Sequence, residues 1–116
     1  MGINEFSFGK VIYAQNNQVY RLGTLSRKES FMKIHIYSHA GHGSGIVSIG
    51  FHYNEYVVKH VIQSDCSCTF YSDSSNTIYV KVPSGALNSM IATSNFYGTI
   101  NVGYNVSLPS NASEIS

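Results

Sequence analysis

Apolar and polar side chains alternate with a period of two residues along most of the chain, and a helical period is nearly absent. The segment 31–38, FMKIHIYS, is a clear example, because Met32, Ile34 and Ile36 alternate with Lys33, His35 and Tyr37. Successive side chains of a strand point to opposite faces of its sheet. This segment therefore predicts a strand with one face in the core and the other turned toward water or a partner.

The same pattern predicts eight or nine strands separated by turn residues. The predicted strand segments are 10–14, 18–25, 31–38, 46–54, 55–64, 67–72, 76–82, 90–94 and 98–106. We expect the first two to form a hairpin through the QNN connection, because Asn accepts the positive φ that tight turns need. Segments 46–54 and 55–64 predict a second hairpin. Only GALNSMIA, residues 85–92, could hold a helical turn.

Short strands with turns between them predict an antiparallel β-sandwich with a jelly-roll-like arrangement. The 116 residues fit one domain. We expect the sandwich to span residues 9–108. Residues 1–8 are interpreted as a linker or as residues added before an excised domain. Residues 109–116 are interpreted as a C-terminal tail of turn and linker composition, with a disordered ending.

Composition narrows the range of partners. Charged residues make up 11% of the chain and the net charge is +1, so no basic stripe is available to neutralise a phosphate backbone, and we expect no nucleic-acid partner. No apolar run reaches the roughly 18 residues that would span a bilayer, so no membrane insertion is expected. Nine Tyr and six Phe accompany Ser, Asn and Thr, a balance typical of surfaces that bind through rings and hydrogen bonds.

Catalytic motifs are missing from the sequence. The six acidic residues fall mostly in predicted turns or near the termini, whereas glycosidase chemistry needs two carboxyl groups that face each other across a cleft. No GxSxG motif frames a nucleophilic serine. We therefore expect no enzymatic activity and no cofactor in this domain.

The two cysteines favour free thiols over a structural disulfide. Cys66 and Cys68 are so close in sequence that a bond between them would strain the ring it closes. Together with His39 and His42 they could form a zinc site, but structural zinc sites usually separate paired ligands by two to four residues. We expect no metal in the domain.

A family resemblance rests on VYRLGTL (19–25), followed by FMKIHIYSHAGHGSG (31–45). This arrangement resembles the C-terminal domains of bacteriophage tail fibres and tailspikes, in which a Y-x-[IL]-G-T stretch precedes an I-x-I strand and a glycine-bearing loop. NTIYVKVPSG (76–85) is similar to the family's strand that ends at a turn, and FYGTINVGYNVSL (96–108) to its closing strand. The likeness covers roughly residues 10–108.

The resemblance implies a distal fibre domain that forms a homotrimer and binds polysaccharide or lipopolysaccharide on a bacterial surface. It also implies a virion protein that is assembled in the host cytoplasm. Neutral faces that carry Thr99, Asn101 and Asn105, or Lys33, His35 and Tyr37, would then meet neighbouring subunits. Two alternatives stay open: a purely structural trimerisation and folding domain of a tailspike whose enzymatic site lies upstream, and an independent sugar-binding lectin.

The histidines around the glycine-rich tract 39–45 allow three interpretations. They could be solvated loop residues, with His35 on the polar face of its strand. They could form a glycan-contacting rim, for which the candidate residues are Tyr37, His39, His42, Tyr53 and Tyr56. They could also hold a metal on a trimer axis, although the chain lacks the alternating His-x-His pattern of such fibres. Arg21 is a separate candidate for binding an acidic sugar.

Overall fold

The structure, a computed structural model, describes residues 7–15, 18–25, 30–38, 44–52, 55–63, 68–82, 87–94, 98–104 and 106–115. The backbone alone is described for 7–15, 38, 44, 51–52, 55–63 and 87–88. These residues form ten β-strands in two five-stranded sheets. Sheet A has the order β1-β8-β3-β4-β5, with bounds Ser7–Gln15, Leu87–Ser94, Phe31–Ser38, Ser44–His52 and Glu55–Gln63. Sheet B has the order β10-β6-β7-β2-β9, with bounds Ser113–Glu114, Thr69–Ser72, Thr77–Lys81, Val19–Leu25 and Gly98–Gly103.

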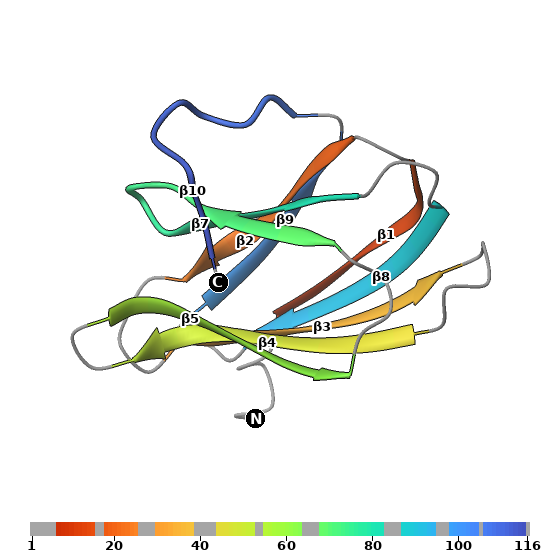
Figure 1. Cartoon of the computed structure of the whole chain (residues 1–116), viewed down its shortest axis with the longest axis horizontal. Helices are drawn as coiled ribbons and strands as arrows, with labels where there is room; N and C mark the ends of the chain where they lie inside the picture. Colours follow the sequence, from red (N-terminus) through yellow and green to blue (C-terminus); the bar gives the residue numbers. More distant parts are fainter. Residues whose placement is uncertain are drawn as a thin grey trace.

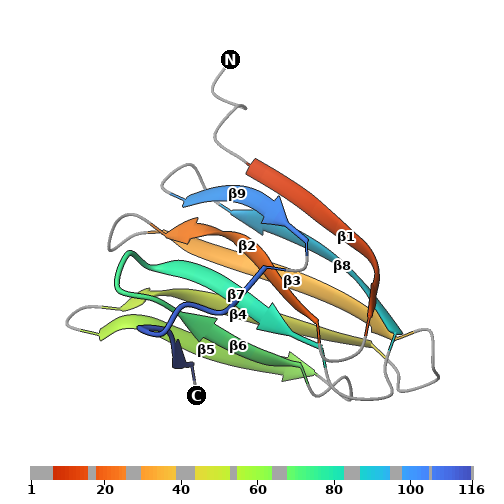
Figure 2. The ribbon, with the colours of Figure 1, turned by 90° about the horizontal axis from the view of Figure 1, so that it is seen from above.

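Every described strand pair is antiparallel, which confirms the predicted all-β, antiparallel class. Figure 1 shows the two sheets as separate layers, and Figure 2 shows sheet B lying in front of sheet A. No helix occurs in the described part of the chain, and so none there has the length and apolar character needed to cross a membrane.

One hydrophobic core lies between the sheets. Sheet A contributes Met32, Ile34 and Ile36 from β3, all of which are almost completely buried. Leu22 and Phe70 are examples of the buried side chains that sheet B contributes. Removal of each such side chain from water stabilises the fold by roughly 1.5–3 kcal/mol. The alternation predicted for residues 31–38 is thus confirmed, because Lys33, His35 and Tyr37 are exposed on the opposite face.

The predicted pairing of strands is confirmed in one place and wrong in another. β4 and β5 form the expected hairpin. The hairpin expected from 10–14 and 18–25 does not form, because β1 pairs with β8 in sheet A whereas β2 pairs with β7 and β9 in sheet B. A tight turn and a crossing between sheets use the same short polar residues, so local composition does not distinguish them.

The helical turn considered for 85–92 is also wrong for its described part, since Leu87–Ser94 is a full strand. This strand is central in sheet A, where it is hydrogen-bonded to β1 and β3. Pairing on both sides outweighs the helix propensity of Ala and Leu.

The C-terminal segment, predicted as a tail of turn and linker composition with a disordered ending, is packed against sheet B up to residue 115. Residues 106–112 cross the outer face of sheet B, as Figures 1 and 2 show in two directions. β10 then pairs with β6, and Ile115, only 5% exposed, belongs to the core. Its amide donates a 2.8 Å hydrogen bond to the carbonyl of Phe70. The segment is therefore part of the packed domain up to residue 115.

Candidate functional site

The outer face of sheet A carries large side chains that the core does not cover. Phe31 and Tyr37 of β3 are 44% and 58% exposed, and Ile91 of the neighbouring strand β8 is 51% exposed. β3 is central in the sheet, between β8 and β4, so these side chains lie on a broad surface and not at an edge. Large apolar side chains exposed on one face of a sheet indicate a candidate binding surface.

Strand register arranges this face in rows that cross the sheet. His35 lies opposite Ile91 of β8 and Ile46 of β4, so an imidazole stands between two isoleucines. Two residues along β3, Tyr37 lies opposite Ser89 of β8. The row of His35 is thus mainly apolar, with the imidazole nitrogens as its polar atoms. The next row carries the phenol of Tyr37 and the hydroxyl of Ser89.

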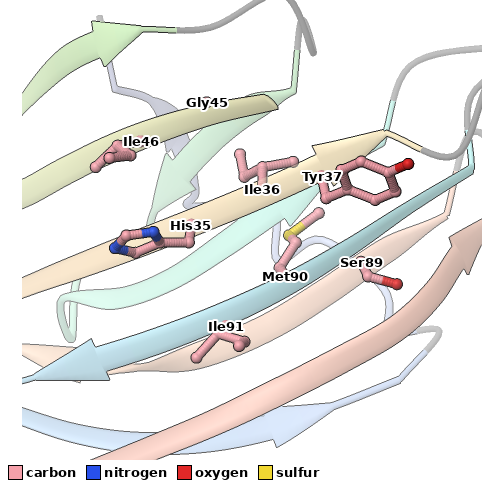
Figure 3. A pocket seen from close by; sticks show the side chains of 8 residues that line it. All are labelled: His35, Ile36, Tyr37, Gly45, Ile46, Ser89, Met90 and Ile91. Atoms are coloured by element: carbon pink, nitrogen blue, oxygen red, sulfur yellow. The ribbon is translucent and has the colours of Figure 1, made fainter. Parts of the chain in front are cut away.

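A hollow of about 350 Å³ lies over these two rows. Figure 3 shows the side chains around it on β8, β3 and β4. The lining residues are His35, Ile36, Tyr37, Gly45, Ile46, Ser89, Met90 and Ile91. Its size is at the lower end of the roughly 300–1,000 Å³ typical of small-molecule sites, and apolar walls with a few polar groups are their usual lining.

Among the site residues predicted from the sequence, the structure describes the side chains of Tyr37 and Arg21, and these two lie on different sheets. Tyr37 lines the hollow, while Arg21 lies on β2 in the other sheet. Tyr56 belongs to β5, where the backbone alone is described. His39, His42 and Tyr53 lie outside the described residues, as does most of the glycine-rich tract.

Seven of the eight residues that line the hollow were not among the predicted site residues. Four of the seven have side chains on the outer face: His35, Ile46, Ser89 and Ile91. The alternation in 31–38 already placed His35 beside Tyr37 on one face. The other three come from strands whose register with β3 is not encoded in any local pattern. Pairing of residues more than fifty positions apart, such as His35 with Ile91, brings them to the same surface.

The outer face of sheet B has its own row, which crosses all five strands. Glu114, Tyr71, Tyr79, Arg21 and Gly103 follow one another in register from β10 to β9. Tyr79 is only 7% exposed although it belongs to this outer face and not to the core between the sheets. The crossing segment 106–112 covers part of this face.

Arg21 holds the edge strand β9 to the sheet. Its Nε donates a 2.9 Å hydrogen bond to the carbonyl oxygen of Asn101. A Cβ added at Gly103 would lie 2.9 Å from Cζ of Arg21, so the guanidinium rests on the glycine backbone. In the structure this arginine stabilises strand β9, and it lies on a different sheet from Tyr37.

Asp73 organises the turn between β6 and β7. Its Oδ1 accepts hydrogen bonds from the amides of Ser75 and Thr77, at 2.9 and 3.0 Å, and its Oδ2 accepts one of 3.2 Å from the Tyr79 phenol. Asn76 has a φ of 61°, the left-handed conformation that Asn tolerates in turns. Nearby, Asn111 Nδ2 donates a 2.7 Å hydrogen bond to Ser74 Oγ, which ties the crossing segment to this turn.

A second hollow, of about 380 Å³, lies beside this turn. It is lined by Ser72, Asp73, Ser74, Asn76, Asn111 and Ser113. Asp73 and Asn111 are already engaged in hydrogen bonds within the turn, so we interpret this hollow as part of the scaffold. Among the described residues, no group of three or more His, Cys, Asp or Glu side chains lies together to hold a metal ion.

Cys68 is partly buried and packs against the core, and Cys66 lies outside the described residues.

Comparisons of the chain with protein-family models, with curated proteins and with solved structures find no match. The outer face of sheet A is therefore interpreted from its own residues.

Proposed function

We propose that this chain is a sugar-binding tip domain of a bacteriophage tail fibre or tailspike, which binds polysaccharide or lipopolysaccharide of the host surface. The observation that carries the proposal is the hollow on the outer face of sheet A, with the exposed ring of Tyr37 beside His35 and Ser89. Rings and aliphatic side chains can pack against the apolar face of a sugar, while imidazole and hydroxyl groups hydrogen-bond its hydroxyls.

The same proposal includes a homotrimer, because the resemblance to fibre tips implies one. The side of the domain at β9 is the surface that we assign to subunit contact. β9 is an edge strand of sheet B that carries the exposed residues Thr99 and Asn101, and Tyr104, 52% exposed, follows it directly. Contact through this side leaves the outer face of sheet A open to ligand.

A jelly-roll-like arrangement is also part of the proposal. Its support is the nested pairing of β1 with β8 and of β2 with β7 outside the β4–β5 hairpin. The domain is proposed to act by binding alone, without catalysis, within the assembled virion. Both described carboxylates, Asp73 and Glu114, lie on sheet B and away from the hollow.

The test is a binding array of bacterial polysaccharides and lipopolysaccharides, probed with the wild type and with Tyr37→Ala. We expect binding that Tyr37→Ala weakens about tenfold or more, since loss of one stacked aromatic ring removes a central contact. Tyr71→Ala is the matched control, because it removes a tyrosine from the outer face of sheet B that lies neither in the hollow nor at the assigned subunit contact. Equal losses in both variants would contradict the assignment of the site to sheet A.

Light scattering on a sizing column, with and without a chelator, tests the trimer. A chelator-resistant trimer that binds no glycan would favour the purely structural trimerisation domain. A trimer lost with chelator would favour a metal on the trimer axis. A monomer that binds glycan would overturn the trimeric tip and favour an independent lectin.

A further inference from the structure

Lys33 is a cationic residue on the outer face of sheet A, and it lies between Phe31 and His35 on this face of β3. It is exposed and lies opposite Thr93 of β8 and Ser48 of β4. Among the described side chains on the outer faces of β8, β3 and β4 there is no carboxylate. The positive charge of Lys33 is therefore not neutralised within this part of the face.

The row that contains Lys33 borders the hollow directly. Lys33 and His35 are two positions apart on one strand, which separates their Cα atoms by about 7 Å. Three successive rows along β3 thus present an ammonium between two hydroxyls, an imidazole between two isoleucines, and a phenol next to a serine hydroxyl. A ligand that lies along β3 meets a cationic polar row, then an apolar row, then a neutral polar row.

We infer that the outer face of sheet A recognises an acidic oligosaccharide, with a sugar carboxylate at Lys33 and an adjacent sugar ring over Ile91 and Ile46. The inference rests on the proposed function and adds the chemical class of the ligand. An ammonium paired with a carboxylate gives a charge-assisted hydrogen bond, and the hydroxyls of Thr93 and Ser48 on either side can hydrogen-bond other sugar oxygens. A neutral sugar in that position would gain no stabilisation from the positive charge of Lys33.

The overall charge does not produce this preference, because the net charge of the chain is only +1. Discrimination between acidic and neutral sugars therefore depends on the local row. A lysine that pairs with a carboxylate at an exposed surface is expected to change affinity by about three- to tenfold, and salt should weaken the effect.

The experiment uses uronic-acid-containing bacterial exopolysaccharides as probes, each in its native form and after chemical reduction of its carboxyl groups. Binding to the whole chain is measured by titration calorimetry at low and at high salt, for the wild type, Lys33→Gln, Lys33→Glu and Lys81→Gln. Lys81 is the matched control, because it is an exposed strand lysine on sheet B. The midpoint of urea unfolding of each variant shows that it remains folded.

The expected result is that the native form binds about three- to tenfold more tightly than its reduced form at low salt. Lys33→Gln should abolish this preference, Lys33→Glu should reverse it, and Lys81→Gln should leave it unchanged. Equal affinity for native and reduced forms would overturn the inference and leave the proposed function standing, provided that Tyr37→Ala still weakens binding. Absence of binding to both forms, and to every glycan of the array, would overturn both proposals.

Discussion

The phenol of Tyr79 donates a hydrogen bond of 3.2 Å to Oδ2 of Asp73, so that strand β7 is tied to the turn from which it starts. Burial raises the pKa of the Tyr79 phenol, and the charge of Asp73 together with this hydrogen bond raises the pKa further, whereas Arg21 lowers it. The folded protein therefore holds the phenol proton more tightly than the unfolded chain does.

The raised pKa of Tyr79 predicts a loss of stability in alkali. The contribution of Tyr79 is fully present below the unfolded pKa of about 10, and it is lost as the pH rises through the higher folded pKa. Tyr79→Phe should lower the free energy of unfolding near neutral pH by about 1 kcal/mol and should make the alkaline loss shallower. Urea unfolding of both proteins across the alkaline range measures this, and identical alkaline slopes would contradict it.

Replacement of Gly23 by alanine is expected to destabilise the fold. A Cβ at this position would overlap the carbonyl oxygen of Thr99 and lie 2.9 Å from Cα of Ile100, both in the backbone of β9. Because backbone cannot yield without loss of strand pairing, Gly23→Ala should cost about 1–3 kcal/mol or more. Gly103→Ala is the control, since the group it meets is the flexible end of Arg21. Equal costs in denaturant unfolding would argue against a rigid β2–β9 contact.

Replacement of Ser94 by alanine is expected to stabilise the fold. Its side chain is 1% exposed, and its Oγ has no hydrogen-bond partner among the described residues. A buried hydroxyl that lacks a partner carries a desolvation cost of about 1–3 kcal/mol, so Ser94→Ala should raise the unfolding free energy by about 1 kcal/mol. Ser48→Ala, on the outer face of sheet A, should change it by less than about 0.5 kcal/mol. A lower melting temperature for Ser94→Ala would indicate a partner for its hydroxyl.

Ile115 predicts that the chain's last described residues are needed for the stability of the domain. Ile115→Ala removes a core side chain and should cost about 2–4 kcal/mol, whereas the exposed neighbour Glu114→Ala should have little effect. Thermal unfolding of the two variants separates the possibilities. If both variants melted at the temperature of the wild type, the C-terminal segment would not be packed against the core in solution.

Much of the local structure could be predicted from the sequence. The alternation in 31–38 was sufficient to predict strand β3, to place Met32 and Ile34 in the core and to place Tyr37 on the opposite face. The β4–β5 hairpin could be predicted as well, because its two strands adjoin in sequence. These features depend on the period-two geometry of a strand, which any one segment displays by itself.

The tertiary structure decided which strands share a sheet and which side chains share a surface. Local patterns could not separate β1 from β2, because the free energy that places them in different sheets comes from pairing with β8 and β7. The same is true of Ile115, whose burial depends on β10 reaching β6.

The sequence by itself therefore determined most of the strands, the buried and exposed faces of 31–38, and a low charge that leaves no basic stripe for a phosphate backbone. Only the tertiary structure set Ile91 and Ile46 on either side of His35 and separated Arg21 from Tyr37. The physical reason is that side-chain alternation is a property of one strand, whereas a binding face is made by register between strands that lie far apart in the chain.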